Sequence, residues 1–179
     1  MAISISHFEI KVRDLPGMEA FYTDTPGFRV TDRSPEDSSR GGHRMVFLSQ
    51  NPGEHHQIVL NDVKDGDFSQ GTLDHPAFRV NDPKVLRSFH DAVAAHGGLD
   101  YETVSHGTTW SLYFRDPEGN RLEFFVDTPW HVAQPLRFPI DLSMSDGDLI
   151  AWTEEKISSL ADFQPVAQWS SNHRQRLKQ

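Results

Sequence analysis

The 179-residue sequence predicts an α+β fold in which two tandem βαβββ modules form a cupped, mostly antiparallel eight-stranded sheet, followed by a partly helical C-terminal extension. Three observations lead to this prediction. A strand-and-helix pattern recurs at a constant spacing, β-rich runs joined by turn residues follow each helix, and prolines interrupt the chain beyond residue 127.

The repeat is found by counting from two histidines. His7 in ISHFEIKV and His75 in LDHPAFRV are each followed, seven residues later, by an aspartate that can cap a helix, Asp14 and Asp82. We therefore expect one domain over residues 1–127, with modules at about 3–60 and 73–127, and an extension over residues 128–179.

The first module opens with a strand over residues 3–12, in which polar and apolar side chains alternate. Its remaining elements follow in chain order: a helix near 16–24 that Pro26-Gly27 ends, a loop or weak strand over 31–44, and strands over 44–49 and 56–60 around a turn at 50–53.

The second module repeats this order with clearer signals. A strand over residues 73–80 precedes a helix that starts at Pro83 and closes at Gly97-Gly98. Strands over 110–114 and 121–126 then form a hairpin around the turn 116–120. Strand alternation puts Glu123 on the face opposite to the apolar side chains that meet the helices, so this carboxylate needs a reason to be there.

Composition excludes several functions. No apolar run approaches the ~20 residues of a spanning helix, and the N-terminus lacks the features of a secretory signal, so we expect a cytoplasmic protein with no membrane partner. A formal charge of −9 argues against nucleic-acid binding. The absence of cysteine restricts any metal to nitrogen and oxygen ligands.

The repeat brings candidate metal ligands into one polar cup. His7 and His75 occupy equivalent positions in the two modules, and Glu123 stands on the last strand of the second. Two imidazoles and one carboxylate leave three coordination positions open, which is typical of non-heme Fe(II) oxygenases. A lone strand histidine is usually structural, but two at repeat-equivalent positions favour a metal site in the cup.

The chain resembles the vicinal oxygen chelate superfamily, and within it the extradiol dioxygenases that cleave catechols. The resemblance spans about residues 6–127, and its most specific part is a gapped pattern of His106, Leu112-Tyr113, Asp116-Pro117, Gly119 and Glu123. It implies one metal site, a catechol and O2 as substrates, and a ring-opened product of the muconic semialdehyde type, as in aromatic degradation. The best-known members carry two pairs of modules, whereas this chain has a single pair, as some active relatives in the superfamily do.

The resemblance also implies roles for individual residues. His7, His75 and Glu123 would bind Fe(II) or, less often, Mn(II). His56 in EHHQIVL would be the acid/base histidine, with His55 as the lesser candidate because strand alternation allows only one of the two to face the cup. His106 and Tyr113 would contact substrate oxygens.

Two other functions stay open. A glyoxalase-like metal-dependent isomerase or lyase would want a carboxylate ligand on the last strand of the first module, where Gln57 follows the two histidines. A metal-free small-molecule-binding protein of the drug-resistance kind would not need the three ligands together. The two classes share the fold, so the ligand set is what separates them from a dioxygenase.

The surroundings of the cup give further expectations. Apolar rings at Phe47, Phe125 and Trp130, with no Arg or Lys cluster, favour a neutral ring substituent. Arg121 is the exception by alternation, and we expect it to pair with Glu9 or an acidic turn residue. The extension, with a helix near residues 145–160, is expected to cover the sheet and in part to support a homo-oligomer, a dimer or larger.

Overall fold

The computed structural model describes residues 3–24, 27–34, 44–63, 72–115 and 121–177. These residues form two compact units, of which unit 1 contains residues 1–5 and 77–166, and unit 2 contains residues 6–76 and 167–179. The predicted turn at 116–120 and most of the connectors after the first helix and before residue 72 lie outside the described residues.

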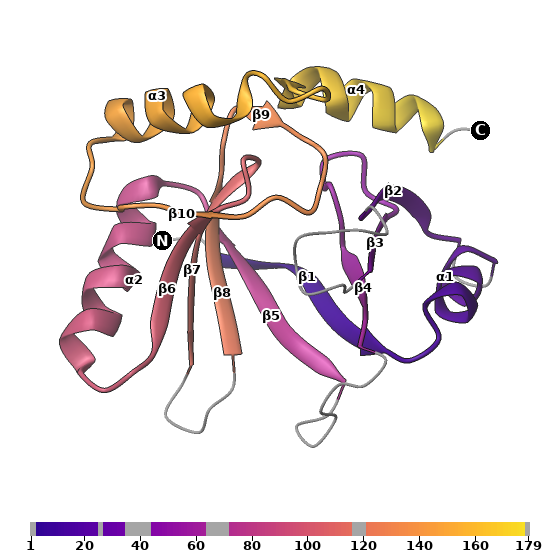
Figure 1. The fold of residues 1–179 in the computed structure, drawn as a ribbon, viewed down its shortest axis with the longest axis horizontal. Helices are drawn as coiled ribbons and strands as arrows, with labels where there is room; N and C mark the ends of the chain where they lie inside the picture. The colour runs from indigo at the N-terminus through magenta and orange to yellow at the C-terminus, as the bar shows by residue number, and fades with distance from the viewer. Residues whose placement is uncertain (1–2, 25–26, 35–43, 64–71, 116–120, 178–179) are drawn as a thin grey trace. The chain divides into compact units, whose positions relative to one another are not determined.

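Unit 2 carries the first module. Its strands are β1 (Ile3–Val12, of which the first three residues belong to unit 1), β2 (Arg29–Arg33), β3 (Met45–Ser49) and β4 (Ile58–Asp62), in the order β1-β4-β3-β2. β1 and β4 are parallel, and the other pairs are antiparallel. Strand β2 covers only the start of the loop or weak strand expected over residues 31–44, of which 35–43 lie outside the described residues. Figure 1 shows β2 and helix α1 (Leu15–Asp24).

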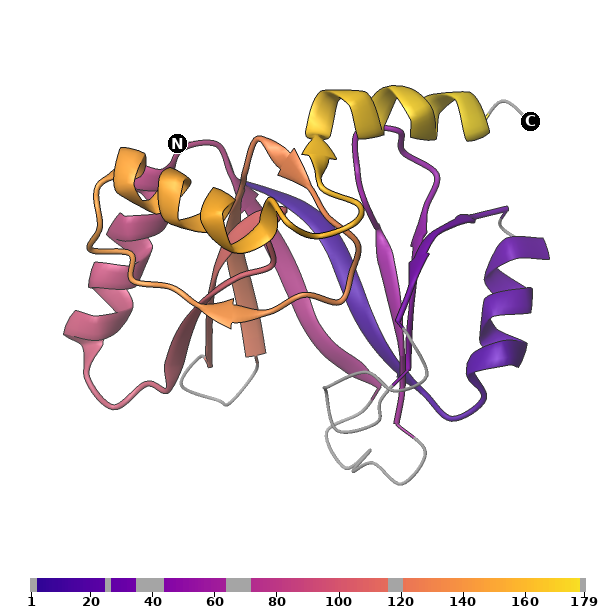
Figure 2. The ribbon, with the colours of Figure 1, turned by 45° about the horizontal axis from the view of Figure 1, so that its top comes forward.

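The core of unit 2 lies between α1 and the sheet. It contains Val12, Leu15, Val46, Leu48 and Leu60. The helix begins as predicted, because the carboxylate of Asp14 accepts a hydrogen bond of 3.1 Å from the backbone N–H of Gly17. Helix α4 (Val166–Arg176) is the yellow C-terminal helix in Figure 2. It carries Trp169, whose ring lies 5.4 Å from that of His55.

Unit 1 carries the second module. Its elements, in chain order, are β5 (Leu73–Val80, which starts in unit 2), α2 (Pro83–His96), β6 (Tyr101–Ser105), β7 (Thr109–Arg115) and β8 (Arg121–Asp127). The strand order β5-β8-β7-β6 repeats that of unit 2, again with the first strand parallel to the last. The prediction of two tandem βαβββ modules in a mostly antiparallel α+β fold is therefore confirmed.

The helix signals of the second module are also confirmed. Asp82 accepts a hydrogen bond from the backbone N–H of Lys84, Pro83 opens α2, and Gly97 ends it with a φ of +71°. The ring of Phe124 lies 4.5 Å from that of Phe89 on α2, so this face of β8 meets the helix as alternation requires.

The C-terminal extension is built into both units. In unit 1 it forms β9 (Trp130–His131), β10 (Phe138–Pro139), α3 (Asp146–Ile157) and β11 (Gln164–Pro165). β10 adds an edge strand to β6, which the sequence did not predict. Helix α3 packs on the same core as α2, because Leu149 is fully buried there and the indole of Trp110 donates a hydrogen bond of 3.0 Å to Thr153.

Within the described residues, no helix is long and apolar enough to cross a bilayer.

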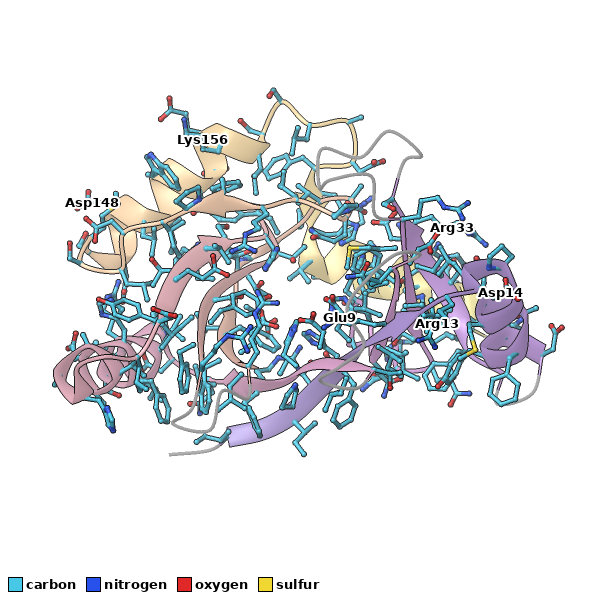
Figure 3. The ribbon with its side chains drawn as sticks, turned by 60° about the horizontal axis from the view of Figure 1, so that its bottom comes forward. Glu9, Arg13, Asp14, Arg33, Asp148 and Lys156 are labelled. Carbon is cyan, nitrogen blue, oxygen red and sulfur yellow. The ribbon has the colours of Figure 1, made fainter. Side chains whose placement is uncertain are left out.

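Replacement of Leu149 by alanine should lower the free energy of unfolding by about 2–5 kcal/mol, because it leaves a cavity between α3 and the sheet. Ile150→Ala is the matched control, because that side chain is 37% exposed on the same helix. Figure 3 shows two other side chains of α3, Asp148 and Lys156, pointing outward. Urea denaturation measures both. Equal small losses in the two variants would mean that α3 contributes little to the core.

Candidate metal centre and catalytic site

Three histidines gather in unit 2. His7 on β1 and His75 at the start of β5 are 7% and 3% exposed, and their ring centroids lie 6.0 Å apart. The ring of His56 lies 4.2 Å from that of His7. Imidazole nitrogens that converge in this way suit a divalent transition metal.

The expectation that strand alternation decides between His55 and His56 is wrong, because neither residue lies in a strand. Both histidines precede β4, which begins only at Ile58, because the turn started by Asn51-Pro52-Gly53 continues to Gln57. Strand alternation therefore does not apply to them.

The geometry nevertheless separates the two histidines. His56 packs on His7, whereas His55 points toward Asp32, 3.6 Å from its Nε2, and toward Trp169. The two Nδ1 atoms lie 2.8 Å apart, so one donates a hydrogen bond to the other. His56 is thus the histidine nearer to the predicted ligands.

Glu123 lies in unit 1, in the middle of β8, and is 2% exposed. Its neighbours across the sheet are Tyr113 on β7 and Ala77 on β5. The hairpin register that the sequence required, with Tyr113 and Glu123 on one face, is therefore present. Each of His7, His75 and Glu123 is buried and offers one ligand atom.

The two parallel ladders identify the counterpart of Glu123 in the first module. Ala77 pairs with Glu123, and Glu9, which holds the position of Ala77 in the repeat, pairs with Val59. The first module therefore presents a buried valine where the second presents a carboxylate. Gln57 lies two residues earlier and outside the strand, so it does not hold the position expected for a ligand of a glyoxalase-like isomerase.

Tyr113 and His106 form a hydrogen-bonded pair in unit 1. The Nδ1 atom of His106 lies 2.7 Å from the carbonyl oxygen of Leu136, and its Nε2 lies 3.1 Å from the hydroxyl of Tyr113. A carbonyl only accepts, so Nδ1 carries the proton. In the neutral imidazole, Nε2 then accepts from the tyrosine hydroxyl, which leaves the phenolic oxygen of Tyr113 as an acceptor for a further donor.

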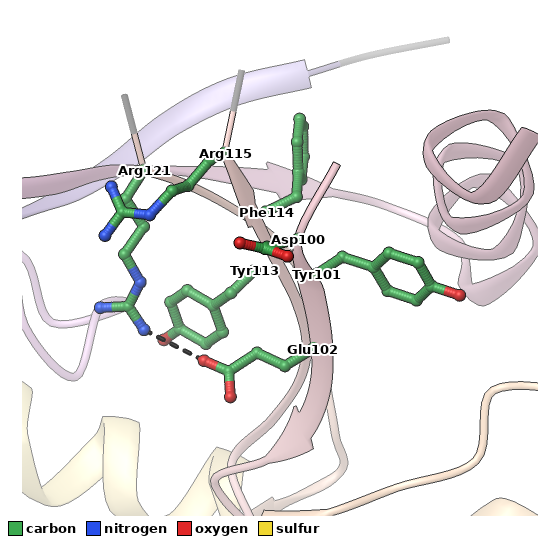
Figure 4. Close-up of a pocket in the computed structure, with 7 residues that line it drawn as sticks. All are labelled: Asp100, Tyr101, Glu102, Tyr113, Phe114, Arg115 and Arg121. Carbon is green, nitrogen blue, oxygen red and sulfur yellow. Dashed lines mark hydrogen bonds and ion pairs between the residues drawn. The ribbon is translucent and has the colours of Figure 1, made fainter. Parts of the chain in front are cut away.

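The face of the Tyr113 ring is lined by arginines. The guanidinium carbons of Arg121 and Arg137 lie 4.5 and 5.7 Å from the ring centroid, and both groups form ion pairs with Glu102. Figure 4 shows Arg121 reaching past Tyr113 toward Glu102, in a pocket of about 310 Å³ that Arg115 also lines.

Glu102 stays ionised in this setting. Burial alone would raise its pKa, but the hydrogen bond and charge of Arg137, helped by Arg121, lower the pKa below the ordinary value. One expectation from the sequence is therefore wrong, because an arginine pair does lie beside Tyr113. Arg121 pairs with Glu102, a partner that the sequence did not predict, and the turn at 116–120 with its acidic residues lies outside the described residues. Arg137 was missed because it stands among prolines in the extension, far from the motif.

The expected aromatic lining is placed unevenly. Phe47 contacts the rings of His55 and His56, and Phe125 lies under Arg79, whose guanidinium carbon is 5.1 Å from the ring centroid. Trp130 instead packs in a buried cluster with Val132 and Ile157. The indole of Trp130 is therefore part of the core of unit 1.

Comparison with known proteins places this chain in a family. The model of the glyoxalase/bleomycin resistance protein/dioxygenase superfamily matches residues 4–124. Biphenyl-2,3-diol 1,2-dioxygenase 3 of Rhodococcus globerulus is 30% identical over 128 residues, which cover 69% of this chain and 63% of that protein. Catechol-2,3-dioxygenase of Bacillus subtilis (strain 168) is 29% identical over 128 residues, 70% of this chain and 42% of that protein.

The matches therefore span less than two thirds of the length of these relatives. Among solved structures, the 2,3-dioxygenase LapB of Pseudomonas sp. KL28 superposes with a TM-score of 0.57 at 22% identity, over 69% of this chain and 42% of that one, which supports the fold. Since the family model covers more than half of the residues and both modules have the βαβββ order, the chain belongs to the glyoxalase/bleomycin resistance protein/dioxygenase superfamily.

Proposed function

We propose that this protein is an Fe(II)-dependent extradiol dioxygenase. It would insert both atoms of O2 into a catechol ring beside the vicinal diol and release a ring-opened product of the muconic semialdehyde type. The observation that carries the proposal is the set of three buried candidate ligands, in which His7 and His75 hold equivalent positions of the repeat and Glu123 stands on the last strand of the second module. The names of the similar proteins, which are ring-cleaving dioxygenases, support it.

Strand β5 supports the combination of the three ligands. His75 and Ala77 are two residues apart on this strand and so face the same side. Glu123 is the partner of Ala77 on β8, and cross-strand partners also share a face. We propose Glu123 as the third ligand beside His7 and His75, whose ring centroids lie 6.0 Å apart within unit 2.

The donor set suits a resident Fe(II) or Mn(II) ion. His7, His75 and Glu123 would hold such an ion and leave coordination positions open. The ion would supply a place where a diol and O2 meet, two reactants that combine slowly in solution. The chain contains no cysteine to favour a softer metal.

The remaining residues would handle protons. His56, next to His7, would take a proton from the catechol and return it to the leaving oxygen later in the cycle. With His106 neutral, the hydroxyl of Tyr113 donates a hydrogen bond to its Nε2. The phenolic oxygen would then accept a hydrogen bond from the diol. We propose residues 1–127 as the catalytic domain for this chemistry.

The competing functions have less support. A glyoxalase-like isomerase would need a ligand where the first module has Val59. A metal-free binding protein would not need His7, His75 and Glu123 together.

A second copy of the chain is the proposed protein partner. The strand β1 leaves Ile3, Ile5 and Phe8 exposed, at 45%, 61% and 41%. Apolar side chains grouped on one strand favour a contact between subunits.

The single substitutions His7→Ala, His75→Ala and Glu123→Ala should each abolish tight binding of iron and leave the fold intact. Elemental analysis of protein purified and reconstituted with Fe(II) without oxygen measures this, and circular dichroism checks the fold. His90→Ala is the control, because this histidine lies on the outer side of α2 beside Asp91. Stoichiometric iron in any one of the three variants would remove that residue from the ligand set.

Replacement of His56 by phenylalanine should retain iron but slow turnover of a catechol by about 10²–10⁴-fold, the usual contribution of general acid–base catalysis. The appearance of a yellow ring-opened product from 3-methylcatechol measures turnover. His55→Phe is the matched control and should keep most of the activity. Normal turnover in His56→Phe together with loss in His55→Phe would reverse the two roles.

Arg121 should influence which ring substituents are accepted. Because it faces Tyr113, Arg121→Met should lower kcat/KM for protocatechuate relative to 3-methylcatechol by about tenfold, the loss of roughly one charge-assisted hydrogen bond. Arg115→Met is the control from the same pocket, at an exposed position. Oxygen uptake with both substrates provides the ratio of the two kcat/KM values. An unchanged ratio in Arg121→Met would mean that the ring substituent does not lie beside Arg121.

A further inference from the structure

His75 is held by the residue that precedes it in the sequence. Its Nδ1 lies 2.8 Å from Oδ1 of Asp74, and the two side chains are 3% and 16% exposed. A carboxylate has only acceptor sites, so this hydrogen bond requires the proton on Nδ1. In the neutral ring, Nε2 then carries the free lone pair, which is the form of imidazole that binds a metal.

Asp74 is in turn oriented by β1. Its other oxygen, Oδ2, lies 3.6 Å from the ammonium nitrogen of Lys11, and the backbone N–H of Lys11 donates a hydrogen bond to the carbonyl of Thr72. One oxygen of the carboxylate therefore faces Lys11 while the other receives the imidazole. All of these contacts lie within unit 2.

The first module does not repeat this arrangement. The residue before His7 is Ser6, whose hydroxyl donates a hydrogen bond of 3.3 Å to Glu54. A carboxylate in the residue that precedes the histidine is thus a feature of the second module.

We propose that Asp74 is a positioning residue for the metal centre, which fixes the tautomer and the ring orientation of His75 and makes Nε2 a stronger ligand. The proposal rests on the function proposed above, in which His75 binds the metal. A carboxylate behind a metal-binding histidine increases the basicity of the ligand, and its loss typically weakens metal binding 10–100-fold.

A different arrangement has to be separated from this one. Ligand atoms of Glu9, Asp74 and His75 also lie within 4.8 Å of one another, so Asp74 is near enough to serve as a direct ligand with them. That arrangement would need Nδ1 of His75 without its proton. It would also draw on Glu9, whose Oε1 now accepts a hydrogen bond of 2.8 Å from Asn61.

The first experiment uses the unaltered protein. Nitrogen-15 NMR of the metal-free chain, recorded at a pH at which the imidazole is neutral, identifies which nitrogen of His75 is protonated. Comparison with the spectrum of His75→Gln assigns the signals to this residue. The Nδ1–H tautomer is expected. The Nε2–H tautomer would overturn the proposal.

The second experiment measures the dissociation constant for Co(II), added alone, by equilibrium dialysis, and the visible spectrum of the bound ion. Asp74→Asn should weaken binding 10–100-fold, and Asp74→Glu should recover part of the loss. Ser6→Ala, at the equivalent position of the first module, should bind as the unaltered protein does.

The outcomes separate the three arrangements. A dissociation constant for Asp74→Asn within twofold of the original would overturn the positioning role. Equal loss in Asp74→Asn and Glu9→Gln would identify Asp74 as a direct ligand and would overturn it too. Unchanged binding in His75→Ala would instead remove the metal centre on which the proposed function depends.

Discussion

The register of two parallel strand pairs is the constraint on which the candidate site depends. β5 and β8 are aligned so that Glu123 lies opposite Ala77, and β1 and β4 are aligned so that Val59 lies opposite Glu9. Because side chains alternate along a strand, a slip of one residue in either pair would turn a whole row of side chains to the other face. The same register that buries one carboxylate leaves the related position apolar, so a symmetric repeat produces an asymmetric ligand set.

The sequence predicted the regular parts of this structure well, because they follow from local rules. Asp14 and Asp82 cap the starts of helices, and Gly97 ends one, as their residue types predict. Alternation in RLEFFV correctly put Glu123 and Phe124 on opposite faces of β8. The placement of His55 and His56 was harder. The sequence suggested a strand there, but the turn at Pro52-Gly53 extends further than its residues indicate, and only tertiary contacts with His7 distinguish the two rings.

Contacts that depend on distant segments were beyond sequence reasoning. Arg137 forms an ion pair with Glu102 from the extension, which the sequence does not indicate. The hydrogen bond between Asp74 and His75 likewise becomes apparent only in the structure. The extension also holds His106, since Gln134 donates a hydrogen bond to its carbonyl and the carbonyl of Leu136 accepts from its ring. Part of the proton arrangement around Tyr113 is therefore set by residues that lie after the family's matched region.

The turn that follows His106 leaves almost no room. Gly107 has a φ of +76°, and a Cβ atom there would lie 2.6 Å from a methyl carbon of Val132 and 3.1 Å from one of Leu136. Its carbonyl also accepts the hydroxyl hydrogen of Thr128. A side chain at this position would have to push the extension away from the turn and, with it, the carbonyl that orients His106. Substitutions meant to change the substrate range should thus be made at the arginines beside Tyr113. A library of variants at residue 107 would yield few folded proteins other than the one with glycine.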